Sequence, residues 1–144
     1  MLIIEDDADL AGVIASSFER YGLEVIVAST GQQAIDLAAT LVPDLVVLDL
    51  MLPEVDGFGV VDWIKDHDLW RSVPLVVYSA LETTPSQQER LRLGPTEFIT
   101  KSRIEPEEFE RRVLDLLDRL ARSGPSHQAV IHQKGNMRDT VIPK

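Results

Sequence analysis

The sequence predicts an α/β fold with a doubly wound sheet of five parallel strands, in the order 2-1-3-4-5, and helices on both faces. Two observations support this prediction. Short aliphatic runs alternate along the chain with segments whose apolar residues recur every three or four positions. The short runs also lack apolar–polar alternation, which is typical of strands buried on both faces. Right-handed crossovers leave few strand orders open, and the order 2-1-3-4-5 is taken from known flavodoxin-like folds rather than from the sequence pattern.

Each expected strand is a run of aliphatic residues that stops at a polar or turn-forming residue. The first stops at the acidic run Glu5-Asp6-Asp7, the third stops at Asp49, and Pro74 opens the fourth. The strands are expected over residues 2–4, 25–27, 45–48, 75–78 and 98–100.

Each expected helix is a segment with one apolar stripe. Gly22 follows the first helix, Ser29 or Thr30 is expected to cap the second, and Pro106 suits the first turn of the last. The helices are expected over residues 10–18, 30–41, 58–64, 85–93 and 106–120.

Length and charge predict one domain followed by a tail. The chain has 144 residues, close to the size of a single domain. The periodic pattern ends near residue 122, so residues 1–122 are expected to form the domain and residues 123–144 a flexible tail or linker. The net charge is −10, which disfavours nucleic-acid binding through this domain.

Several classes of protein are excluded or disfavoured by composition. The chain has no cysteine, so disulfide scaffolds, thiolate metal sites and cysteine nucleophiles are excluded. No apolar run reaches the roughly 18 residues that cross a bilayer, and the N-terminal residues are acidic rather than basic. We therefore expect a cytoplasmic protein that has no membrane partner.

Polar side chains follow four of the five expected strands. Glu5 and Asp6 follow the first, Asp49 the third, Ser79 the fourth and Lys101 the fifth. Ligands bind at the carboxyl ends of strands in such sheets, so these groups are expected to share one crevice. Clustered carboxylates repel each other, and a single lysine does not balance them. A hard divalent cation, best Mg²⁺, is the natural complement.

This set of side chains points to phosphoryl transfer. A carboxylate can attack phosphorus and form an acyl phosphate. An ammonium and a cation stabilise the charge on the transferring group, and a serine hydroxyl can donate a hydrogen bond to it.

The same residues carry a resemblance to a known family. The sequence closely resembles the receiver domain of two-component response regulators over residues 1–122. The motifs are Ile3-Ile4-Glu5-Asp6-Asp7, Val46-Val47-Leu48-Asp49-Leu50-Met51-Leu52-Pro53 with Asp56-Gly57, Tyr78-Ser79-Ala80, and Phe98-Ile99-Thr100-Lys101. Each motif alone is a weak signal, but their order and spacing together are a strong one.

The resemblance implies a role for each group at the site. Asp49 is implied to be the phosphoacceptor and a Mg²⁺ ligand. Asp6 is implied to bind Mg²⁺ directly, Glu5 to assist through water, and Met51 to contribute its backbone carbonyl. Lys101 is implied to pair with the phosphoryl group.

The resemblance also implies a switch and partners. Ser79 is the switch hydroxyl and Phe98 the switch aromatic residue, and they act on the face around the fourth helix, fifth strand and fifth helix. The phosphoryl donor is a sensor histidine kinase or a histidine phosphotransfer protein, and a homodimer would use the same face. The protein is then a signalling switch that catalyses only its own phosphorylation and dephosphorylation, not an enzyme.

The sequence departs from the family pattern near the expected site. Ser102 follows the lysine where the family usually has proline, which alters the expected loop. Met51 and Leu81 stand two residues beyond Asp49 and Ser79. In the family that the sequence resembles, side chains at these positions influence how water reaches the acyl phosphate. Because both are apolar, we expect slow self-dephosphorylation.

Other interpretations compete with this one. A phosphorylation-independent receiver-like scaffold would lack an acid or the lysine, and an aspartate-nucleophile phosphatase of the haloacid-dehalogenase kind would have a second aspartate where Met51 stands. A flavodoxin-type cofactor binder would need a phosphate-binding loop in place of the acidic run. Taken alone, that run is also a plausible helix cap, Ser79 a turn residue and Phe98 a core residue.

Overall fold

A computed structural model describes residues 1–122 of the chain, so the expectation for residues 123–144 lies outside the described residues. The five strands are β1 (Leu2–Ile4), β2 (Ile26–Ala28), β3 (Val46–Leu48), β4 (Leu75–Ser79) and β5 (Thr96–Thr100). The five α-helices are α1 (Ala8–Glu19), α2 (Gly31–Ala38), α3 (Gly57–Lys65), α4 (Pro85–Leu91) and α5 (Pro106–Arg122). Two short 3₁₀ helices, η1 (Asp68–Trp70) and η2 (Lys101–Arg103), lie between them.

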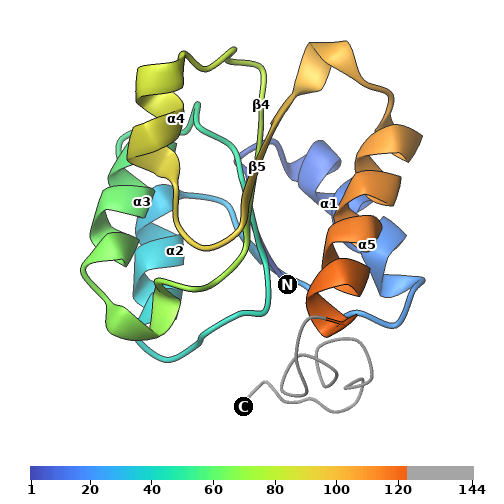
Figure 1. Cartoon of the computed structure of the whole chain (residues 1–144), viewed down its shortest axis with the longest axis horizontal. Coiled ribbons are helices and arrows are strands. Elements are labelled where there is room, and N and C mark those ends of the chain that lie inside the picture. Colours follow the sequence, from blue (N-terminus) through green and yellow to red (C-terminus); the bar gives the residue numbers. More distant parts are fainter. Residues whose placement is uncertain (123–144) are drawn as a thin grey trace.

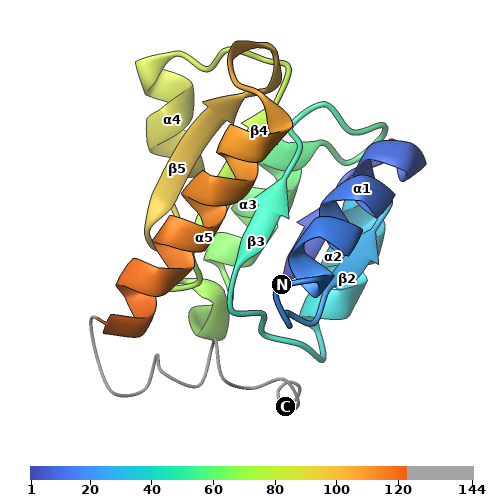
Figure 2. The same cartoon turned by 90° about the vertical axis from the view of Figure 1, so that its right-hand side faces the viewer.

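The predicted fold class and strand order are confirmed. All the strand pairs are parallel, and the order is β2-β1-β3-β4-β5. Helices α2, α3 and α4 cover one face of the sheet, while α1 and α5 lie side by side on the other (Figures 1 and 2).

Side chains of one strand alternate between two cores. Leu2 and Ile4 pack in the core under α2, α3 and α4, whereas Ile3 packs in the core under α1 and α5. Both faces are covered, so the inner strands are apolar up to Ser79, the last residue of β4. The edge strand β2 is the exception, because Ile26 and Val27 are 41% and 40% exposed.

Some predicted boundaries are wrong by a few residues. Strand β2 lies one residue later than expected because Ile26 pairs with Leu2. Strand β5 begins at Thr96, two residues before the expected start. An edge strand accommodates polar residues, so its first residues do not form an apolar run that would mark its start. Helix α2 ends at Ala38, and two hydrogen bonds between residues three apart tighten its last turn. Helix α4 ends at Leu91, two residues before the expected end.

The helix starts follow ordinary capping chemistry. Thr30, one of the two residues expected to cap α2, accepts a hydrogen bond from the backbone amide of Gln33. The carboxylate of Asp7 caps α1, so the helix-cap interpretation of the acidic run holds for this residue. Asp56 caps α3 in the same way.

Two glycines are expected to respond in opposite directions to alanine. A Cβ atom at Gly57 would lie 2.7 Å from both the Asp49 carbonyl oxygen and Leu50 Cα, so Gly57→Ala must displace backbone and should lower the free energy of unfolding by roughly 2 kcal/mol or more. A Cβ atom at Gly12, within α1, meets nothing within 4 Å, so Gly12→Ala should raise it by about 0.5–1 kcal/mol. Urea denaturation measures the free energy of unfolding of both variants. An equal change in that free energy would contradict the close packing of backbone against Gly57.

Candidate functional site

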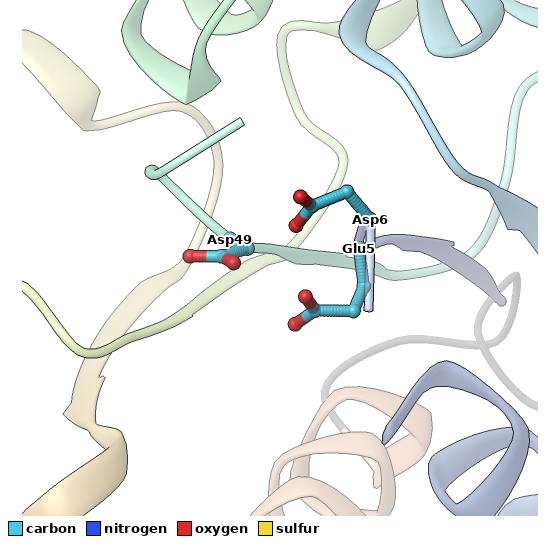
Figure 3. Close-up of side chains that lie close together, drawn as sticks. All are labelled: Glu5, Asp6 and Asp49. Carbon is cyan, nitrogen blue, oxygen red and sulfur yellow. The ribbon is translucent and has the colours of Figure 1, made fainter. Parts of the chain in front are cut away.

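The register of the sheet brings the polar groups at the strand ends together. Ile4 of β1 lies beside Leu48 of β3, and Leu48 lies beside Val77 of β4. The next residues along the first two strands, Glu5 and Asp49, therefore leave the sheet at the same level. Figure 3 shows the side chains of Glu5 and Asp6 extending from the end of β1 toward Asp49.

Asp49 is buried at the centre of this group, with 5% of its surface exposed. Its Oδ1 accepts hydrogen bonds from the hydroxyl of Ser79 at 2.8 Å and from the backbone amide of Met51 at 3.1 Å. Its Oδ2 accepts from the ammonium of Lys101 at 3.3 Å. These donors compensate for the burial of the carboxylate and fix its orientation.

Glu5 is the second buried acid, and it shares Lys101 with Asp49. Its Oε1 accepts from Lys101 Nζ at 2.8 Å and its Oε2 from the backbone amide of Asp7 at 3.1 Å. Burial raises the pKa of Glu5, and the nearby charge of Asp49 raises it further, while Lys101 and the Asp7 amide act in the opposite direction. Lys101 thus opposes the effect of burial on the pKa of Glu5.

Lys101 has 22% of its side chain exposed and lies between the two buried carboxylates. Burial by itself would lower the pKa of Lys101, but the hydrogen bonds and charges of Glu5 and Asp49 outweigh burial and raise it. The site therefore holds one positive charge at neutral pH against two buried carboxylates and the exposed Asp6.

The three acids fit a hard divalent cation. Glu5, Asp6 and Asp49 each offer a carboxylate oxygen, and these oxygens lie within 4.8 Å of one another. Both oxygens of Glu5 already accept hydrogen bonds, whereas Asp6 is exposed and accepts none within the part of the chain that the structure describes. An all-oxygen set with an excess of negative charge suits Mg²⁺.

The structure brings together the groups that the sequence predicts at the strand ends. Glu5, Asp49, Ser79 and Lys101 are connected by direct hydrogen bonds, and a carboxylate oxygen of Asp6 lies within 4.8 Å of oxygens of Glu5 and Asp49. The hydroxyl of Ser79 points at Asp49, which a turn residue would not require.

Other expected site residues lie at the edge of this group. The side chain of Met51 is 59% exposed, and the backbone amide of Leu81 lies 3.4 Å from the Ser79 hydroxyl. Phe98 is half-buried and packs against the core under α2, α3 and α4, with the guanidinium of Arg92 5.8 Å from its ring centre.

Sequence patterns did not reveal one charge cluster on the neighbouring face. Glu97 of β5 accepts from Arg112 at 3.2 Å and from Arg119 at 2.9 Å, both on α5. Both pairs lie within the chain. The sequence does not reveal them, because no apolar run marks the start of β5 at Thr96 and so Glu97 is not recognised as a strand residue.

In the part of the chain that the structure covers, none of the helices combines the length and apolar character needed to span a bilayer.

Comparisons with known proteins agree with this geometry. The family model of the response regulator receiver domain matches residues 1–114. The alkaline phosphatase synthesis transcriptional regulatory protein PhoP of Bacillus subtilis is 32% identical over 128 residues, which are 89% of this chain and 52% of that protein. The chain spans about half the length of the curated relatives it matches.

Solved structures give the same result. The receiver domain of the Francisella response regulator 1452 has a TM-score of 0.69 at 30% identity, covering 82% of this chain and 95% of that one. The signal receiver domain of a signal transduction histidine kinase from Syntrophus aciditrophicus has a TM-score of 0.70 at 27% identity, covering 85% of this chain and 92% of that one.

Proposed function

The chain belongs to the response regulator receiver domain family, whose members are signalling switches of two-component systems rather than classical enzymes, and we propose that Asp49 is its phosphoacceptor. The donor is phosphohistidine on a partner histidine kinase or histidine phosphotransfer protein, and the reaction requires Mg²⁺. We expect it to take place in the cytoplasm.

The observation that carries this proposal is the environment of Asp49. This buried carboxylate has a hydroxyl donor from Ser79 on one oxygen and an ammonium from Lys101 on the other. A structural carboxylate needs such donors only to compensate for burial. These two donors lie at the carboxyl ends of the strands, which is where ligands of doubly wound folds bind. The nearby excess of acids supplies the second requirement, a cation site.

The residues present fit Mg²⁺. Asp6 and Asp49 would bind it directly, Glu5 would assist through water, and Met51 would contribute its backbone carbonyl. Mg²⁺ bound there supplies positive charge against the oxygens of a phosphoryl group. The hydrogen bonds of Glu5 to Lys101 and to the Asp7 amide support a role through water rather than direct binding.

The chain's own groups perform the transfer. A carboxylate oxygen of Asp49 attacks phosphorus, the bond between phosphorus and the histidine nitrogen breaks, and that nitrogen keeps the electron pair and takes up a proton. Lys101 holds an ammonium beside the phosphoryl oxygens. Ser79 turns its hydroxyl from Asp49 Oδ1 to a phosphoryl oxygen.

The output is proposed to pass from Ser79 through Phe98 to the face formed by α4, β5 and α5. Phe98 lies on β5 and packs in the core under α4, which supports a link between the two. The pairs of Glu97 with Arg112 and Arg119 already satisfy charges on this face. A homodimer through it would therefore have to exchange these pairs for pairs between subunits.

A receiver-like scaffold that works without phosphorylation is the second candidate. It predicts the same fold and the same partners but no covalent change. The complete set of Asp6, Asp49, Ser79 and Lys101 favours the phosphoacceptor.

Incubation with phosphoramidate and Mg²⁺ tests the proposal. We expect intact mass spectrometry to show one added phosphoryl group per chain, and peptide mapping after borohydride reduction to place it at Asp49. Addition of EDTA should prevent labelling. After the donor is removed, the label should persist for minutes or longer, because Met51 and Leu81 offer no polar group to an attacking water. A label on another residue, or none, would contradict the phosphoacceptor proposal, and a lifetime of seconds would contradict slow dephosphorylation.

A further inference from the structure

Tyr78 lies directly before Ser79 on β4, on the side of the sheet covered by α1 and α5. Its side chain is buried, with 6% of the residue exposed. The ammonium of Lys101 lies 5.7 Å from the centre of the Tyr78 ring, within the range of a cation–π contact. Lys101 is thus held by three groups: the carboxylate of Glu5, the carboxylate of Asp49 and the ring of Tyr78.

The Tyr78 ring is itself fixed by two other aromatic residues. It stacks on Phe109 of α5 with ring centres 3.9 Å apart and planes inclined by 19°. Phe109 meets Phe18 of α1 edge to face, with centres 6.2 Å apart. This aromatic column runs from the candidate site into the core between the sheet and the two helices that lie together in Figure 2. The ring therefore offers Lys101 a rigid surface.

We propose that Tyr78 is a positioning residue, whose ring holds the Lys101 ammonium between Glu5 and Asp49 and so prepares it to meet the transferring phosphoryl group. This inference rests on the proposed function of Asp49. A lysine side chain has a flexible stem with four rotatable bonds, and 22% of the Lys101 side chain is exposed to solvent. The negative face of a fixed ring restricts the motion of this stem and favours one position of the charge.

The ring rather than the hydroxyl is the active part of Tyr78. Within the described residues, the hydroxyl makes no hydrogen bond to another side chain or to the backbone. Phenylalanine at this position therefore keeps everything that the proposal requires, whereas leucine keeps an apolar side chain but removes the ring.

Nuclear magnetic resonance of the protein labelled with ¹³C-lysine tests the placement. The chain has four lysines, so the spectrum is simple, and Lys101→Arg assigns the signal of Lys101. In the wild type we expect the Hε signal of Lys101 to lie upfield of exposed lysines, because the protons next to Nζ face the ring. Tyr78→Phe should keep this upfield shift and Tyr78→Leu should abolish it. An upfield shift that survives in Tyr78→Leu would overturn the proposal.

The rate of labelling by phosphoramidate tests the consequence. We expect Tyr78→Leu to lower the rate about fivefold, as for the loss of one cation–π contact, and Tyr78→Phe to remain within about twofold of the wild type. Tyr21→Leu is the matched control, because Tyr21 is an exposed tyrosine of the loop after α1 whose hydroxyl contacts only Glu110 among the described residues. An equal loss in both Tyr78 variants would overturn a role of the ring.

The two readouts separate this inference from the proposed function. If the wild type is not phosphorylated at all, the proposed function fails, while the lysine spectrum still decides whether Tyr78 holds Lys101. If labelling proceeds at the wild-type rate in Tyr78→Leu although the upfield shift is lost, the phosphoacceptor stands and the positioning role is overturned. Urea denaturation of each variant confirms that a folded domain is compared.

Discussion

We expect the Asp49→Asn variant to incorporate less than about 1% of the phosphoryl group that the wild type takes up from phosphoramidate and Mg²⁺. The amide has no anionic oxygen, so it cannot attack phosphorus or bind a cation with the strength of a carboxylate. Its shape is nearly that of aspartate, and its oxygen still accepts from Ser79 and Met51. Loss of labelling therefore reports chemistry rather than packing, and intact mass spectrometry measures it.

Asp56→Asn is the matched control for this variant. Asp56 lies in the loop after β3 and caps α3 through a hydrogen bond from the Gly59 amide, which asparagine also accepts. The control should label like the wild type. Undiminished labelling of Asp49→Asn would place the phosphoryl group elsewhere and remove the central assignment of the site.

The second large effect is expected for Lys101→Met, which should lower the rate of labelling about 10²- to 10³-fold. Among the described residues, Lys101 is the cation that contacts Asp49, and removal of one preorganised donor at developing negative charge costs this much in enzymes. Methionine keeps the length and apolar part of the side chain. Time courses at saturating Mg²⁺ measure the rate, and a change below about tenfold would contradict a direct role of Lys101.

The same variant should also lose stability in a pH-dependent way. The pKa of Glu5 in the folded protein is already raised by burial, and removal of Lys101 takes away the strongest influence that lowers it. A carboxyl group whose pKa is raised by folding stabilises the folded state at pH values below its ordinary pKa of 4.5. That stability is lost as the pH rises through the pKa of the group in the folded protein. The deficit of Lys101→Met relative to the wild type should therefore be small near pH 4 and grow toward roughly 2–3 kcal/mol at pH 8.

Lys65→Met controls for the loss of a positive charge elsewhere. Lys65 ends α3, and its ammonium donates to the Arg90 carbonyl on α4 rather than to an acid of the site. Urea denaturation at several pH values should give this variant a stability deficit that does not depend on the ionisation of Glu5. A constant deficit of Lys101→Met across the same range would contradict the coupling of Lys101 to Glu5.

Much of the candidate site was predictable because it depends on strand ends. Asp49 follows three consecutive aliphatic residues, and Lys101 follows the last strand, so a parallel sheet necessarily brings them to one edge. The family resemblance added roles to these positions but not their contacts. Only the tertiary structure shows that Ser79 donates a hydrogen bond to Asp49 Oδ1. It also shows that Lys101 donates to both Glu5 and Asp49.

Residues that act through long-range packing were not predictable. Tyr78 is one more apolar member of a buried strand, and nothing local relates it to Lys101 or Phe109. Glu97 lies in a polar segment before the expected start of β5. The sequence therefore does not predict its ion pairs with Arg112 and Arg119 of α5.

By itself, the sequence determined the α/β class, the five strands and five helices, and the acids, hydroxyl and lysine that end the strands. These follow from periodicity and residue type, which are local properties of the chain. Only the tertiary structure decided which donor meets which oxygen of Asp49, which aromatic ring supports Lys101, and where the edge strands begin. Those features depend on register and side-chain packing between segments far apart in the chain, and an apolar pattern is compatible with many such pairings.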